Sequence, residues 1–195
     1  MKSAEIRKQF NMSYDELVRY LLKKYGKAQY DYFVNESCKS RNPKVMRTDE
    51  GLHCHHIDGN KVDYLSSEKL ARENSFEHQK ADRLVYCNAF EHLILHIKIT
   101  PLMKNGEFNW VNPVFKLCEG INDFYSGYEF KQKWRVVAFD LIKNNFEDYV
   151  LALIYILNSW LKYLPREDDY DAVMAMLTNC SNRKFSDKLW DIINI

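Results

Sequence analysis

The stretch 52–57, which reads LHCHHI, decides the fold that the rest of the chain builds around it. Gly51 precedes it and an Asp-Gly pair at 58–59 follows it, a pattern that predicts a short strand ending in a turn. Successive side chains of a strand point to opposite faces. We therefore expect the neighbouring histidines His55 and His56 to have different surroundings and different roles.

Histidine is concentrated around this strand. All six histidines of the 195-residue chain lie between His53 and His96, in less than a quarter of its length. Imidazole binds transition metals and exchanges protons near neutral pH. The clustering therefore predicts a site with metal chemistry, acid–base chemistry or both.

A second strand and a helix follow the first strand. Residues 83–87 (RLVYC) predict the strand, and a capping box at 88–91 (NAFE) opens a helix over 89–99. Residues 60–82 between the two strands are polar and irregular, with a short helix predicted near 66–73. The predicted order is strand, long loop, strand, helix.

The histidines of this helix share a face separate from its apolar stripe. His92 and His96 lie one turn apart, which places their Cβ atoms about 6 Å from each other, so both imidazoles can bind a single cation. The apolar stripe consists of Phe90, Leu93, Ile94 and Ile97. One histidine of the 55–56 pair can face the helix and join them on a metal ion. The other is then free to face a substrate.

This division of roles suits metal-assisted cleavage of a phosphodiester bond. A neutral imidazole can deprotonate a water molecule. A cation can neutralise the phosphate and the leaving 3′ oxygen during an in-line displacement.

Taken together, these segments resemble the HNH endonucleases. The matching residues are 55–59 (HHIDG), 84–86 (LVY), the pair 91–92 (EH) and His96. The family includes phage-type homing nucleases, some restriction enzymes and the nuclease colicins, which share a ββα-metal finger. The resemblance covers residues 47–99, about a quarter of the chain. It implies a metal-dependent endonuclease that hydrolyses phosphodiester bonds, with DNA as the expected substrate.

The resemblance implies a role for each of four histidines. His55 corresponds to a metal ligand, and His92 and His96 correspond to the remaining ligands of one divalent ion. His56 corresponds to the general base, for which an ordinary histidine pKa predicts cleavage that rises through about pH 6–7. Imidazole ligands favour Zn, Ni, Co or Mn, and nucleases with this finger also work with Mg.

One position departs from the family pattern. The family has an asparagine directly before the second strand, nine residues ahead of the first helix histidine, and Arg83 occupies that position here. In the family the asparagine braces the loop of the histidine pair or binds the metal. Its replacement implies a weakened site, an altered site or an inactive nuclease. We include Arg83 among the candidate catalytic residues as a phosphate contact, the alternative being a surface charge without a role.

A basic segment lies just ahead of the first strand. The chain has a net charge of only +1, but residues 1–50 contain eleven Lys and Arg against seven Asp and Glu. Arg41, Lys44 and Arg47 belong to this excess, and we treat them as candidate substrate-binding residues that contact phosphates. A solvated polar loop explains the same charges equally well.

The remaining sequence is predominantly helical. A capping box at 13–16 opens a helix that ends at Gly26. Helices are predicted in the C-terminal half at 113–125, 129–144, 146–163, 167–179 and 184–194. We expect an α+β, predominantly helical fold. Its ββα-metal module (49–99) is embedded between an N-terminal helix with a basic loop (1–48) and a helical C-terminal region (100–195).

Other classes of protein were compared with the same residues. A closed structural zinc site made of Cys54, Cys87, His92 and His96 would leave no open position for catalysis. A related hypothesis treats the finger as a scaffold for a helical body that docks on protein or DNA. The sequence contains neither the His-Glu-x-x-His motif of gluzincin proteases nor the His-x-Glu motif of zinc deaminases, which excludes both classes.

The expected setting follows from composition. The segment MKSAEIRKQF at 1–10 contains no apolar run, and the longest apolar stretch (149–164) is shorter than the ~20 residues of a membrane span. Five cysteines without a CxxC pair favour reduced thiols. We expect a cytoplasmic protein with double-stranded DNA as partner and no membrane partner. The sequence leaves the oligomeric state open and is compatible with a homodimer.

Overall fold

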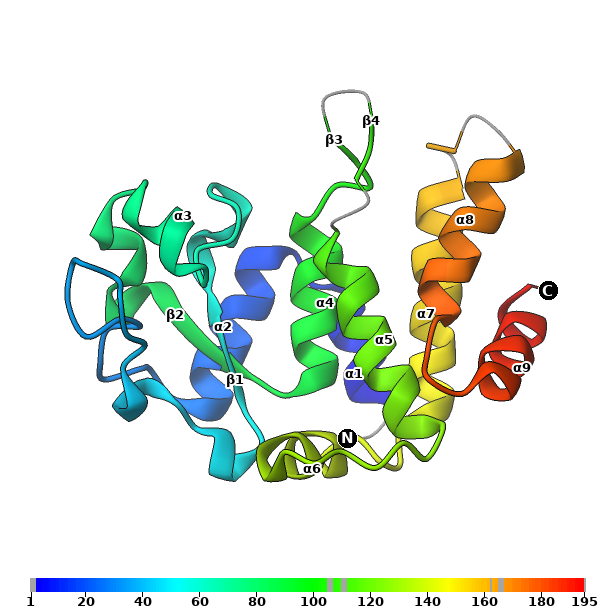
Figure 1. Ribbon diagram of the computed structural model, residues 1–195, viewed down its shortest axis with the longest axis horizontal. Helices are drawn as coiled ribbons and strands as arrows, with labels where there is room; N and C mark the ends of the chain where they lie inside the picture. The colour runs from blue at the N-terminus through cyan, green and yellow to red at the C-terminus, as the bar shows by residue number, and fades with distance from the viewer. Residues whose placement is uncertain (1–2, 105–106, 110–111, 162, 165–166, 195) are drawn as a thin grey trace.

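The computed structural model describes residues 3–104, 107–109, 112–161, 163–164 and 167–194. The helices of this part are α1 Ser3–Asn11, α2 Tyr14–Tyr25, α3 Glu68–Arg72, α4 Ala89–Ile99, α5 Pro113–Tyr125, α6 Lys133–Asp140, α7 Phe146–Leu161, α8 Glu167–Thr178 and α9 Arg183–Ile193. The strands are β1 His53–His56, β2 Leu84–Cys87, β3 Met103–Lys104 and β4 Glu107–Phe108. The fold is therefore predominantly helical with very little strand, as the sequence predicts (Figure 1).

The strand, loop, strand, helix order is observed as expected. β1 and β2 form an antiparallel pair in which His55 lies opposite Val85 and His56 lies opposite Leu84. β1 is one residue shorter at each end than its predicted range, and β2 begins one residue later than predicted and ends at Cys87 as predicted. α4 follows β2 after one residue, Asn88, whose side chain accepts a hydrogen bond from the Glu91 amide and so begins the helix. This places the helix histidines directly beside the sheet.

The strand pair is anchored to the helices through one continuous core. α2 begins with the predicted capping box at Ser13, and its Leu17 and Leu21 are fully buried. They belong to the same apolar cluster as Val85 of β2 and Phe90 of α4. The predicted 49–99 segment therefore shares its packing with the chain on both sides of it.

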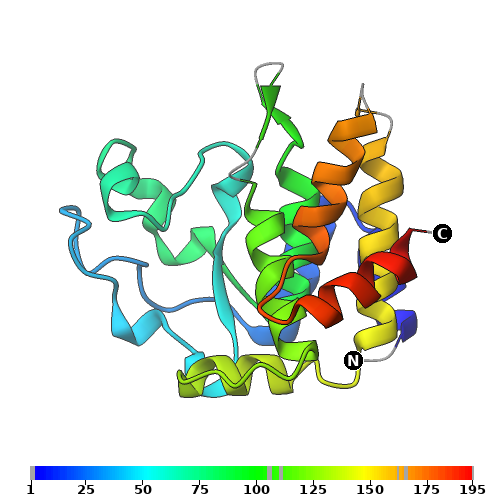
Figure 2. The ribbon, with the colours of Figure 1, turned by 45° about the vertical axis from the view of Figure 1, so that its right-hand side comes forward.

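The C-terminal helices form the rest of this core. α4 packs on α5, α5 packs on α8, and α7 contacts both α8 and α9. Figures 1 and 2 show α7 and α8 side by side, with the β3–β4 hairpin projecting from the end of α4. Tyr149 of α7 is fully buried, and its hydroxyl donates to Asn122 Oδ1 of α5 at 2.7 Å. No helix in the described part of the chain has the length and hydropathy needed to cross a bilayer.

Several elements differ from the sequence prediction. Of the helix predicted at 129–144, only α6 forms. Ahead of it, Phe130 stacks on Phe139 with 4.9 Å between ring centroids, and Arg135 lies over the Phe130 ring. α1 was not predicted, and its Ile6 is buried in the common core. The β3–β4 hairpin was not predicted either, since two residues per strand give no periodic signal. The predicted helix over 146–163 corresponds to α7, and position 162 lies outside the described residues.

Gly51 allows α6 to approach the start of β1. Its φ is +72°, a conformation that side chains disfavour, and a Cβ at this position would lie 2.8 Å from the carbonyl oxygen of Val137. α6 therefore packs directly against the backbone ahead of the strand, and both views show it beside the beginning of β1. As a result, Trp134 of α6 lies close to His53, with 6.0 Å between ring centroids.

Candidate metal centre and active site

Three histidines converge where β1 packs on α4. His55, His92 and His96 each present a ligand atom, and these atoms all lie within 4.8 Å of one another. The Nε2 atoms of His92 and His96 are 3.2 Å apart. The His55 ring is edge-on to both of the other rings. The spacing inferred from the helix and strand periods thus produces the expected group of three imidazoles.

A buried carboxylate fixes the start of the helix that contains two of these histidines. Glu91 has no exposed surface, and its oxygens accept hydrogen bonds from the Asn88 amide at 2.9 Å and the Tyr25 hydroxyl at 2.9 Å. The ammonium group of Lys24 lies 2.8 Å from the same carboxylate. Because His92 follows Glu91 directly, this network holds the first helix histidine in place.

Tyr14 of α2 holds the strand histidine. Its hydroxyl donates to the carbonyl oxygen of Ile57 at 2.8 Å and lies 3.1 Å from Nε2 of His55. Burial raises the pKa of Tyr14 well above its usual value, so the hydroxyl keeps its proton and remains a donor. No local pattern links Tyr14 to a residue 41 positions away, so the sequence does not predict this contact.

Burial keeps the histidines neutral. It lowers the pKa of His53, His56 and His96 to about 4. It also lowers the pKa of His55 and His92 well below the usual value, with a further lowering from neighbouring imidazoles. Neutral imidazoles have the free lone pairs that a transition metal binds. The donor set therefore fits one borderline or soft divalent cation. Because the pKa of His56 is lowered to about 4, the predicted rise in cleavage moves from pH 6–7 to lower pH.

We expect the metal-free protein to lose stability as the pH falls. Unfolded histidines protonate near pH ~6.5, whereas the five buried ones stay neutral in the folded chain. Because the unfolded chain binds more protons, the free energy of unfolding should fall by roughly 2 kcal/mol between pH 7.5 and 6.5, and further toward pH 4. Urea denaturation in a chelator at several pH values measures this. An unfolding free energy that is constant over the range would contradict it.

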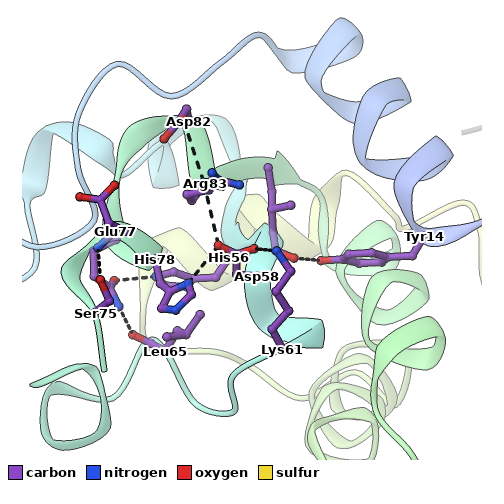
Figure 3. A network of polar contacts seen from close by, with 12 residues as sticks. Tyr14, His56, Asp58, Lys61, Leu65, Ser75, Glu77, His78, Asp82 and Arg83 are labelled. Atoms are coloured by element: carbon purple, nitrogen blue, oxygen red, sulfur yellow. Dashed lines mark hydrogen bonds and ion pairs between the residues drawn. The ribbon is translucent and has the colours of Figure 1, made fainter. Parts of the chain in front are cut away.

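His56 lies on the other face of β1, and its Nδ1 forms no hydrogen bond with the residues that the structure describes. Its Nε2 is 2.8 Å from Oε1 of Gln79, whose own amide nitrogen donates to the Leu65 carbonyl at 3.1 Å (Figure 3). Since Gln79 Oε1 can only accept, His56 Nε2 bears the ring proton. The lone pair is then on Nδ1, where a general base needs it. Gln79 is fully buried and lies in the polar loop between the strands. No pattern in the sequence of that loop predicts its contact with His56.

Both histidines of the pair line one cavity. The cavity has a volume of about 810 Å³. His56 and the three clustered histidines, which we call the triad (His55, His92 and His96), contribute to its wall. Arg41 lines it as well, and its guanidinium lies 5.7 Å from the Tyr32 ring. Tyr32 in turn packs on His56, with 4.4 Å between ring centroids. Arg41 is therefore the predicted substrate-binding residue that the fold brings to the histidines.

Two other basic candidates lie elsewhere. Lys44 is exposed, and its ammonium group lies 5.4 Å from the ring centroid of Tyr30. Arg47 is paired with Glu50 and donates to the Tyr25 carbonyl at 2.6 Å. Neither is among the described residues that line the cavity. The guanidinium group of Arg47 thus holds the segment ahead of β1 against the end of α2. The composition of the sequence does not predict these contacts.

Asp58 organises the loop after the histidine pair. Its carboxylate is 4% exposed and lies 2.6 Å from Lys61 Nζ and 3.0 Å from His78 Nδ1 (Figure 3). Burial opposes its ionisation, but the hydrogen bonds from Lys61 and His78 outweigh that effect and lower its pKa. Arg83 Nε lies 4.0 Å from the same carboxylate. Arg83 thus sits beside the loop of the pair, and the described cavity-lining residues do not include it.

The cysteines of the alternative zinc site lie on opposite faces of the strand pair. Cys54 alternates with His53 and His55 along β1, so it shares the face of His56, whereas Cys87 lies opposite His53 in the register. Among the described residues, the cluster able to hold a metal contains three histidines and no cysteine. The four residues of that alternative are therefore not brought together.

Comparisons of the chain with protein-family models, with curated protein sequences and with solved structures gave no significant match. A function for the chain is therefore inferred from the geometry of the site itself.

Proposed function

We propose that this protein is a metal-dependent endonuclease of the HNH type that hydrolyses phosphodiester bonds in DNA. The observation that supports this most strongly is the pairing of two sites on one strand. His55 joins His92 and His96 in a group that fits a divalent cation, and the next residue, His56, borders the same cavity with a free Nδ1.

In this proposal His56 acts as the general base. Its Nδ1 takes a proton from a water molecule, the water oxygen attacks the phosphorus, and the bond to the 3′ oxygen breaks on the opposite side. A divalent ion held by the three histidines would neutralise charge on the phosphate and the leaving oxygen. Gln79 keeps the ring proton of His56 on Nε2, and Arg41 supplies a positive charge at the cavity wall.

The setting of the proposed nuclease is part of the same hypothesis. Double-stranded DNA in the cytoplasm is the expected substrate, and the oligomeric state stays open, with a homodimer compatible with the proposal. Arg83 retains the proposed role of a basic group near the substrate, although its closest charged partner in the fold is Asp58. The basic residues Lys44 and Arg47 stay as proposed phosphate contacts outside the cavity.

Metal analysis combined with a plasmid-nicking assay tests the proposal. The full chain is stripped with a chelator and reloaded with Zn, Ni, Co, Mn or Mg before nicking is measured. The variants His92→Ala and His96→Ala are expected to weaken zinc binding at least about 100-fold, because each removes one of only three protein ligands. His78→Ala, which removes a histidine outside the cluster, should retain the zinc affinity.

Each outcome separates the hypotheses. Nicking that requires the metal and disappears with the triad supports the nuclease. Tight metal binding without nicking under any of the ions would contradict it and would favour the non-catalytic, metal-stabilised binding module. Nicking that persists in the stripped protein would contradict the proposed mechanism.

A further inference from the structure

Among the described residues, one ring nitrogen of the triad and one of the neighbouring His53 are buried without a hydrogen-bond partner. His53 Nε2 and His92 Nδ1 are both inaccessible to solvent, and neither forms a hydrogen bond within the described part of the chain. The two rings lie 5.1 Å apart between centroids, with 32° between their planes. A buried polar atom without a partner costs about 1–3 kcal/mol, so two of them on adjacent rings call for a physical explanation.

The orientation of His92 shows which nitrogen is available for the metal. Its Nε2 lies 3.2 Å from Nε2 of His96, so this nitrogen faces the triad. Nδ1, on the other side of the ring, is then left to donate a hydrogen bond. Histidines that bind metals usually donate their second N–H to an acceptor, which fixes the tautomer and the ring orientation. A neutral imidazole such as that of His53 can provide one acceptor nitrogen.

We propose that His53 is the positioning residue for His92. In the metal-loaded protein its Nε2 would accept the proton on His92 Nδ1, a hydrogen bond that the two rings do not yet form in this structure, and so would hold the His92 lone pair on Nε2. This inference rests on the proposed metal centre and adds a function for a histidine that the family resemblance leaves without one. His53 touches neither the metal nor the substrate in this arrangement.

The fold restricts the His53 ring to this place. His53 and His55 point to the same face of β1, because they are two residues apart on one strand. The ring lies between His92 of α4 and Trp134 of α6, at 5.1 Å and 6.0 Å between centroids. α6, the helix of Trp134, packs closely against the backbone at Gly51 through Val137 and Ala138. The His53 ring thus has neighbours from both α4 and α6.

Zinc affinity of three variants tests the role. His53→Ala removes the acceptor and is expected to weaken zinc binding about 10- to 100-fold, the usual cost of losing such a partner. His53→Gln should recover most of the affinity, since its amide oxygen can reach the position of Nε2 and accept the same proton. Cys54→Ala, on the opposite face of the same strand, controls for disturbance of β1 and should bind zinc as the wild type does.

The ligand set should not change in these variants. Cobalt-loaded wild type and His53→Ala are expected to have the same d–d absorption spectrum, because His53 is not a ligand. A changed spectrum would overturn the assignment and make His53 a ligand itself. Equal zinc affinity in His53→Ala and wild type would also overturn it, as would a His53→Gln variant no better than His53→Ala.

The protonation state of His92 can also be measured in the wild-type protein, which avoids any effect of a substitution on folding. Long-range proton–nitrogen spectra of the zinc-loaded wild type should show His92 protonated on Nδ1, with slow exchange of that proton with water. A rapidly exchanging or absent proton contradicts the inference. Zinc binding without DNA cleavage would contradict the proposed nuclease and leave His53 in its role, whereas a wild type that binds no zinc contradicts both.

Discussion

The variant His56→Ala is expected to fold, to bind one divalent metal ion with the wild-type affinity, and to lose DNA cleavage by about 10²- to 10⁴-fold, the usual contribution of a general base. Its side chain faces Gln79 and Tyr32, whereas the triad lies on the other face of β1. The substitution therefore removes the base without removing a ligand. Single-turnover cleavage of a defined duplex, at saturating metal, measures the chemical step.

Chemical rescue separates loss of the base from a general disturbance of the site. The truncated side chain leaves space at the wall of a cavity of about 810 Å³, so free imidazole should restore part of the rate. Free imidazole can also replace a missing metal ligand, so rescue is scored only at metal concentrations where His56→Ala binds the wild-type amount of metal. Undiminished cleavage by metal-loaded His56→Ala would contradict the assignment of the base.

The sequence predicts the parts of this site that depend on local periodicity. The spacing of His92 and His96 on one helix face follows from the turn of an α-helix, and both capping boxes form as predicted. The alternation of a strand separates His55 from His56. These features need no knowledge of distant residues, which is why the triad could be inferred from the chain alone.

The contacts that hold the site together depend on distant residues instead. Gln79 lies 23 positions from His56, and Lys24 lies 67 positions from Glu91. The loop that contains Gln79 has no periodicity that would place it. Likewise, the charge of Arg47 could be counted in the sequence, but its pairing with Glu50 and the Tyr25 carbonyl could not. Tertiary packing decides each of these cases.

Glu91→Ala is expected to lower the free energy of unfolding by about 3–5 kcal/mol, the usual cost of breaking a buried ion pair from one side. The carboxylate is fully buried, it pairs with Lys24, and it accepts hydrogen bonds from Tyr25 and from the Asn88 amide. Gln9 Nε2 also donates to it at 3.3 Å, so alanine leaves four donors without this acceptor. Urea denaturation of the metal-free protein measures the loss.

The chain contains a matched control for this prediction. Glu16 occupies the same third position in the capping box of α2, but it lies at the surface and its box includes no Lys or Tyr from another helix. Glu16→Ala should therefore destabilise the protein clearly less than Glu91→Ala. Glu91→Gln keeps an acceptor for the Asn88 amide and removes the charge, so its loss should be intermediate.

The same substitution links stability to the metal centre. Without the carboxylate, the first turn of α4 keeps Asn88 as its N-cap but loses the other half of the capping box and the link to α2, and His92 follows directly. We therefore expect Glu91→Ala to bind zinc more weakly than Glu16→Ala does, even at temperatures where both variants are folded. Equal zinc affinities with unequal stabilities would show that the buried pair supports the core alone and does not position the triad.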